Sequence, residues 1–86
     1  MIFLFHKHFE KQLRKLSKRQ RERVKEQLTF FLEDPFHPLL NNHSLQGKYQ
    51  GYRSISIEGD LRAIYKLSDS VTSIFVAIGT HSALYR

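Results

Sequence analysis

The sequence predicts an α+β fold, a small antiparallel sheet with a two-helix hairpin packed on one face. Two observations predict it. Apolar side chains recur at helical spacing over residues 5–32, and apolar and polar side chains alternate over residues 52–78, with two turns between the strands. Residues 2–5 suit a further strand because their side chains favour a pleated surface. The expected order is β-α-α-β-β-β, in a single domain that spans residues 1–86.

The two predicted helices each carry one apolar stripe and are separated by a start signal. The first stripe consists of Phe5, Phe9, Leu13 and Leu16. Ser17 stands three residues before Gln20, the spacing of a capping box, so a new helix is expected to start there. The second stripe consists of Val24, Leu28, Phe31 and Leu32. Pro35 and Pro38 end this helix because proline lacks the amide hydrogen that helical bonding needs.

Alternation predicts which strand residues share a face of the sheet. With a three-residue turn over 58–60, Ile57 would face Leu61, Ile55 would face Ala63 and Arg53 would face Tyr65. On the last strand, the residues expected in the core are Ile74, Val76 and Ile78. The residues expected on the open face, away from the helices, are Ser54, Ser56, Arg62, Ile64, Phe75, Ala77, Gly79 and, by extension of the strand, His81.

The composition restricts the functional classes. A net charge of +6 in 86 residues, with a sequence pI of about 9.9, favours an acidic partner such as nucleic acid over a role in solubility alone. The absence of cysteine excludes disulfides and thiolate chemistry. The apolar run at the amino end is too short for a signal peptide or a membrane span, so we expect a cytoplasmic protein without a membrane partner.

Basic residues concentrate in the predicted helices, with nine of the fourteen between Lys7 and Lys25. Binding to RNA phosphates and a merely solvated face are both open interpretations of this cluster. The residues predicted to bind RNA or the ribosome are Lys7, Lys11, Arg14, Lys15, Lys18, Arg19 and Arg53.

A set of polar side chains can cut RNA without a metal or a cofactor. Two imidazoles can serve as base and acid near neutral pH, and an arginine can stabilise charge on a phosphate. The nucleophile is the 2′-hydroxyl of the substrate itself. The candidate catalytic residues are His43, Asp60, Arg62, His81 and Tyr85. Each also has a structural alternative: a surface or capping histidine, an Arg62–Glu58 ion pair, a turn aspartate and a hydrophobic plug at Tyr85.

Three segments, taken in order, resemble the RelE/ParE toxin superfamily and in particular its YafQ-like branch. They are H-S-L-Q-G-K-Y-Q-G-Y-R-S, G-D-L-R-A-I-Y-K-L and I-G-T-H-S-A-L-Y. The resemblance implies a RelE-like fold and the toxin of a type II toxin–antitoxin pair. It implies a metal-independent endoribonuclease that cleaves messenger RNA on the ribosome. The implied partners are a cognate antitoxin, mRNA and ribosomal RNA.

The same resemblance places His43, Asp60 and His81 in the active site and Tyr85 at the position of a functional aromatic residue. Three positions depart from the YafQ-like pattern: Ser56 replaces a further catalytic histidine, Leu61 a tryptophan and Ala77 an arginine. Arg62 could supply the charge missing at Ala77. Two other classes remain open, a ParE-like inhibitor of DNA gyrase that acts by binding protein and an inactive homologue that only binds antitoxin.

Overall fold

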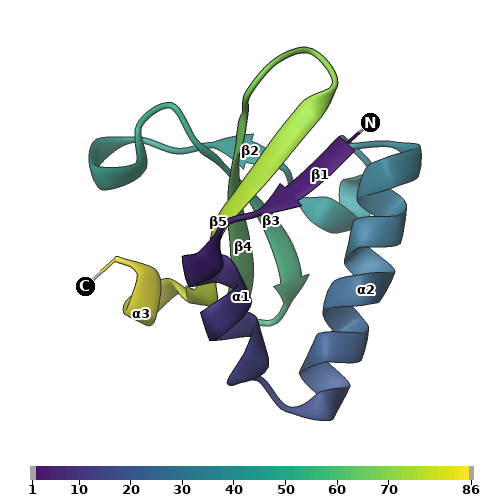
Figure 1. Cartoon of the computed structure of the whole chain (residues 1–86), viewed down its shortest axis with the longest axis vertical. Helices are drawn as coiled ribbons and strands as arrows, with labels where there is room; N and C mark the ends of the chain where they lie inside the picture. The colour runs from purple at the N-terminus through teal and green to yellow at the C-terminus, as the bar shows by residue number, and fades with distance from the viewer. Residues whose placement is uncertain (1, 86) are drawn as a thin grey trace.

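The computed structural model describes residues 2–85, which form one five-stranded sheet with helices on both sides (Figure 1). The strands are β1 (Ile2–Phe5), β2 (His43–Ser44), β3 (Arg53–Glu58), β4 (Leu61–Leu67) and β5 (Thr72–Thr80). The α-helices are α1 (Lys7–Arg14), α2 (Lys18–Glu33) and α3 (His81–Leu84), and the 3-10 turns are η1 (Pro38–Leu40) and η2 (Gly47–Tyr49). The order predicted from the sequence is confirmed, with β2 and α3 as additions.

The sheet is mixed rather than antiparallel. Its strand order is β1-β5-β4-β3-β2, and β1 pairs with β5 in parallel. The other neighbouring pairs are antiparallel. The prediction of an antiparallel sheet was wrong at this edge because the helical hairpin and three further strands intervene between β1 and β5. A connection of that length lets the chain return in the same direction.

Local capping sets both helix starts. The side chain of His6 accepts a hydrogen bond from the backbone amide of His8 at the start of α1. Ser17 and Gln20 form the predicted capping box at the start of α2. Between them, Gln12 of α1 accepts a hydrogen bond from the amide of Ile78 at 2.9 Å. Because β1 pairs only with the first half of β5, α1 covers the edge that β1 leaves open.

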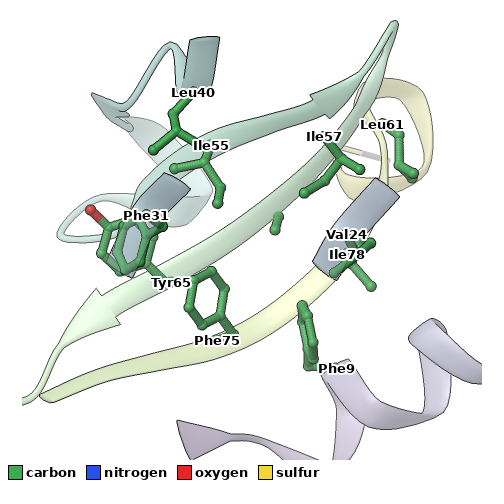
Figure 2. Close-up of a cluster of buried hydrophobic side chains, with 11 residues drawn as sticks. Phe9, Val24, Phe31, Leu40, Ile55, Ile57, Leu61, Tyr65, Phe75 and Ile78 are labelled. Carbon is green, nitrogen blue, oxygen red and sulfur yellow. The ribbon is translucent and has the colours of Figure 1, made fainter. Parts of the chain in front are cut away.

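The main core lies between the sheet and the helices α1 and α2 (Figure 2). Phe75 has no exposed surface, and its ring lies within 6.0 Å of five other rings, centroid to centroid: Phe3, Phe5, Phe9, Phe31 and Tyr65. The prediction that Phe75 faces away from the helices was therefore wrong. Ile78 belongs to this core as predicted, whereas Ile74 and Val76 line a hollow outside it.

A β-bulge explains this difference. Ile64 pairs with Ala77 and the next residue, Tyr65, pairs with Phe75, so Val76 is an extra residue on β5. One extra residue reverses the alternation on its far side. Predictions beyond the bulge, for Ala77 and Gly79, are confirmed by their pairing with Ile64 and Arg62, whereas those before it fail.

A second irregularity lies at the β3–β4 hairpin. Its loop is the two residues Gly59 and Asp60, with Gly59 at a φ of +47°, rather than the three residues expected. A bulge between Ser56 and Glu58 compensates for the shorter loop. The predicted pairs of Ile55 with Ala63 and of Arg53 with Tyr65 are therefore confirmed, while Leu61 faces Glu58 in place of Ile57.

The buried face of α2 differs from the predicted apolar stripe because a glutamine is buried where a leucine was expected. Leu32 is 53% exposed, and Gln27 is buried in its place. The Gln27 amide donates to the carbonyl oxygens of Ser56 at 2.7 Å and of Leu39 at 3.2 Å. A polar side chain here satisfies the carbonyl that the bulge removes from the strand ladder.

Candidate functional site

The start of α3 is joined to the tip of the β3–β4 hairpin. The backbone amide of His81 lies 3.2 Å from the carbonyl oxygen of Asp60 and 3.2 Å from its Oδ2 atom. Thr80 caps the helix through its side chain, which accepts from the amide of Ala83. The terminal segment was expected to extend the last strand. It instead turns into a helix at His81, because the cap and the Asp60 acceptors take up the first free amides.

Arg62 stands beside this junction on the open face. It pairs with Gly79 across β4 and β5 and with Ser56 across β3 and β4. Its Nε atom lies 3.9 Å from Oδ1 of Asp60, and this buried atom has no hydrogen-bond partner among the described residues. The alternative pairing with Glu58 is wrong, since Glu58 binds Arg19. Arg62 therefore presents an unsatisfied donor next to Asp60 and His81.

His43 approaches the same face from the opposite edge of the sheet. It lies in β2 and pairs with Ser54, which pairs in turn with Ile64. Residues directly opposite in a ladder point to one face, so His43 shares the open face with Arg62. From the strand spacing and rise, the backbones of His43 and Arg62 are about 12 Å apart. That separation leaves room between the two side chains for a ribonucleotide.

A row of aromatic rings extends from His81 over the open face. The His81 and Tyr85 rings are stacked with centroids 4.6 Å apart, Tyr85 lies 5.4 Å from Tyr49, and Tyr49 lies 6.0 Å from Tyr52. Tyr49 and Tyr52 were not predicted as site residues. The segment K-Y-Q-G-Y, with two tyrosines and a glycine near a basic residue, is the signal that could have found them.

The three tyrosines of this row pack on a second, smaller core of Ile64, Ala77 and Leu84. Burial, together with the neighbouring Tyr85 and Tyr52, raises the pKa of Tyr49 above its usual value. Lys48 donates from its Nζ atom to the carbonyl oxygen of Leu84 at 3.1 Å. The segment around η2 therefore holds α3 in place on the open face, on the side of the sheet opposite α2 (Figure 1).

The predicted RNA-binding residues occupy different surroundings. The side chains of α1 and of the α1–α2 turn are exposed, as binding to phosphates requires: Lys7, Lys11, Arg14, Lys15 and Lys18. Arg19 is exposed but forms a bidentate ion pair with Glu58, with contacts of 2.6 and 2.7 Å. Arg53 pairs with Tyr65, a core residue on the helix side, and its Nε atom donates to Asn42. Arg53 is therefore not brought together with the open-face residues.

Of the five predicted catalytic residues, four form one connected group: Asp60, Arg62, His81 and Tyr85. His43 joins them across the face without direct contact. Within residues 2–85, no group of three or more histidine and acidic side chains is arranged to hold a metal ion. Across the same residues, no helix has the length and apolar character that a membrane crossing would need.

The fold is that of the small RelE-type toxins. The YoeB/ParE toxin from Agrobacterium tumefaciens superposes with a TM-score of 0.78 at 20% identity, over 94% of this chain and 99% of that chain. A family model described as "Bacterial toxin of type II toxin-antitoxin system, YafQ" matches residues 2–86. The chain therefore belongs to the YafQ family of toxins, and the resemblance read from its three segments is confirmed.

Individual relatives agree with this assignment. The mRNA interferase toxin YafQ of Escherichia coli B/BL21-DE3 is 32% identical over 81 residues, 90% of this chain and 87% of the relative. The protein of the same name from strain K12 is 41% identical over 51 residues, which span 59% of this chain and 54% of the relative. The crystal structure of YafQ from strain BL21(DE3) superposes with a TM-score of 0.82 at 28% identity, over 98% of this chain and 97% of that chain.

Proposed function

We propose that this chain, as one RelE-like domain over residues 1–86, is the toxin of a type II toxin–antitoxin system and acts as an mRNA interferase. The relatives that carry this name support the activity. The observation that carries the proposal is the junction at which Asp60 contacts both the amide of His81 and the guanidinium of Arg62. The reaction is endonucleolytic cleavage of messenger RNA through attack by a ribose 2′-hydroxyl.

His43 is the general base in this mechanism. Its Nδ1 atom lies 2.8 Å from the carbonyl oxygen of Asn41. A carbonyl can only accept, so Nδ1 carries the proton and Nε2 of the neutral ring keeps its lone pair. Nε2 can therefore take the 2′-hydroxyl proton. The resulting oxygen attacks the adjacent phosphorus, and the bond to the 5′-oxygen breaks to leave a 2′,3′-cyclic phosphate.

His81 is the acid that returns a proton to the leaving 5′-oxygen. Among residues 2–85 no group hydrogen bonds to its ring, which is held by stacking on Tyr85. The guanidinium of Arg62, whose side chain is 26% exposed, stabilises the negative charge that develops on the phosphate oxygens. Asp60 holds both residues in position, through the His81 backbone and the Arg62 side chain.

The partners follow from the same assignment. E. coli YafQ has been crystallised in complex with DinJ; the complex superposes on this chain with a TM-score of 0.75 at 30% identity, over 98% of this chain and 97% of that chain. We expect a cognate antitoxin that neutralises this chain, and mRNA on the ribosome as its substrate, which places its action in the cytoplasm. The exposed basic side chains of α1 are the expected contacts with ribosomal RNA.

Inducible expression with mapping of transcript ends tests this function. We expect growth arrest, with cuts in messages that carry 2′,3′-cyclic phosphate ends. His81→Ala should abolish the cuts and keep antitoxin binding, because the bonds to Asp60 come from the His81 backbone. The control is His37→Asn, which removes an imidazole outside the catalytic group and keeps a side chain that can cap η1. This variant should cut like the parent. Growth arrest with intact transcripts would exclude the nuclease and favour a gyrase inhibitor.

A further inference from the structure

A hollow lies on the open face, toward β1. Its volume is about 390 Å³, and its lining residues are His6, His8, Tyr52, Lys66, Ile74 and Val76. Lys66 pairs with Ile74, and the catalytic candidate Arg62 lies four residues earlier on β4. Side chains four residues apart on a strand share a face and are about 13 Å apart. The hollow is therefore outside the catalytic group but on the same surface.

The donors around this hollow suit a phosphate. His6 accepts the His8 amide on Nδ1, so its neutral ring carries the proton on Nε2, which is free to donate. The ammonium of Lys66 is exposed and adds a full positive charge. Among the described residues, no acidic side chain lines the hollow.

The hollow also offers a surface for a base. Tyr52 is half-buried, and the Nζ atom of Lys66 lies 5.8 Å from the centre of its ring. Tyr52 is the last ring in the row that runs through Tyr49 and Tyr85 to His81. A single strand of RNA that follows these rings would reach both the hollow and the catalytic group. Stacking of a base on such a ring contributes about 1–3 kcal/mol.

We infer that this hollow is a nucleotide subsite, which binds the phosphate and base of an RNA residue next to the cleaved link. Lys66 and His6 contact the phosphate, and Tyr52 contacts the base. The inference rests on the proposed ribonuclease function and adds a position of substrate recognition to it.

The test is cleavage of mRNA on programmed ribosomes under single-turnover conditions. The probes are messages that carry one uncharged methylphosphonate link at successive positions beside the cut. In the parent protein, one position should slow cleavage about fivefold, the size of one lost exposed charge contact. In Lys66→Gln the same methylphosphonate link should slow cleavage less than it does in the parent, because the charge that it would have met is already absent.

Two further variants keep the test specific. His6→Asn retains a good helix cap and removes the imidazole, so it should reduce the penalty at the same position without unfolding α1. Lys25→Gln removes the same charge from an exposed position on α2, and it should behave like the parent. If each methylphosphonate link slows cleavage by Lys66→Gln as much as it slows cleavage by the parent, the subsite does not exist and the nuclease function stands. If the parent cuts none of the messages, the proposed function fails as well.

Discussion

The backbone amide of His81 donates to two oxygens of one residue, the carbonyl and the Oδ2 atom of Asp60, each at 3.2 Å. Asp60 comes from a hairpin loop and His81 from the start of α3, 21 positions apart. Their contact fixes where α3 begins and therefore where the His81 ring stands relative to Arg62. Asp60 thus has a structural and an electrostatic role, and the two can be separated by substitution.

Asp60→Asn should separate these roles. The amide oxygen of asparagine can still accept from His81, whereas the charge beside Arg62 is lost. Asp60→Ala loses both the charge and the side-chain acceptor. We expect both variants to cleave more slowly, and only the alanine variant to lose about 0.5–1.5 kcal/mol of stability. Thermal unfolding and cleavage rates measured on the same preparations check this. Equal stability of the two variants would show that the Oδ2 contact does not hold α3.

Ser56→His should raise the cleavage rate. Ser56 pairs with Arg62 on the open face, at the position where the YafQ-like pattern has a further histidine. An additional acid or base positioned there should accelerate cleavage by about tenfold or more, since general acid–base groups typically contribute 10²–10⁴-fold. Ser54→His is the matched control. Ser54 is 2% exposed, so a histidine there should destabilise the fold and gain no activity. A Ser56→His protein that folds and cuts no faster would remove Ser56 from the site.

Phe75→Ala should be strongly destabilising. Its fully buried ring lies among five other rings, and truncating such a residue leaves a cavity that costs about 3–5 kcal/mol. Chemical denaturation should show a lower midpoint with an unchanged slope. Phe36→Ala is the control, because Phe36 is 65% exposed and should change stability little. A small loss at Phe75 would contradict the register on both sides of the Val76 bulge.

The fold could largely be predicted from the sequence because its signals are local. The Ser17–Gln20 capping box and the apolar positions Phe9, Val24 and Phe31 each report on their own helix. The bulge in β5 has no such local signal in the sequence. The extra residue Val76 is apolar, like its neighbours, so simple alternation placed Phe75 on the wrong face. Only pairing with β4 reveals the shift.

Part of the candidate site could be predicted from local alternation, and the rest depends on tertiary contacts. Arg62 lies between the two bulges, so alternation placed it correctly on the open face. The contact of Asp60 with His81 depends on where β5 stops, which is decided by the Thr80 cap and by tertiary contacts. The aromatic row through Tyr49 arises from the packing of η2 against α3 and leaves no periodic pattern in the sequence.

The ion pair between Arg19 and Glu58 should make stability depend on pH in the acid range. Hydrogen bonding to Arg19 lowers the pKa of Glu58 below its ordinary value of 4.5 in the folded protein. The folded state therefore favours the carboxylate, and this contribution is complete above the ordinary pKa. It is lost as the pH falls through the lowered value.

Glu58→Gln should therefore be less stable than the parent near pH 7, and the two should converge as the pH falls below the lowered pKa. Thermal unfolding of both proteins between neutral pH and pH 3 measures this difference. Raising the ionic strength should reduce it, since the Arg19 side chain is 72% exposed. Glu22→Gln removes a carboxylate of α2 that lies 3.8 Å from Lys25, and it should keep the pH dependence of the parent. A constant stability gap between Glu58→Gln and the parent at every pH would show that the charge of Glu58 contributes nothing to the stability of the fold.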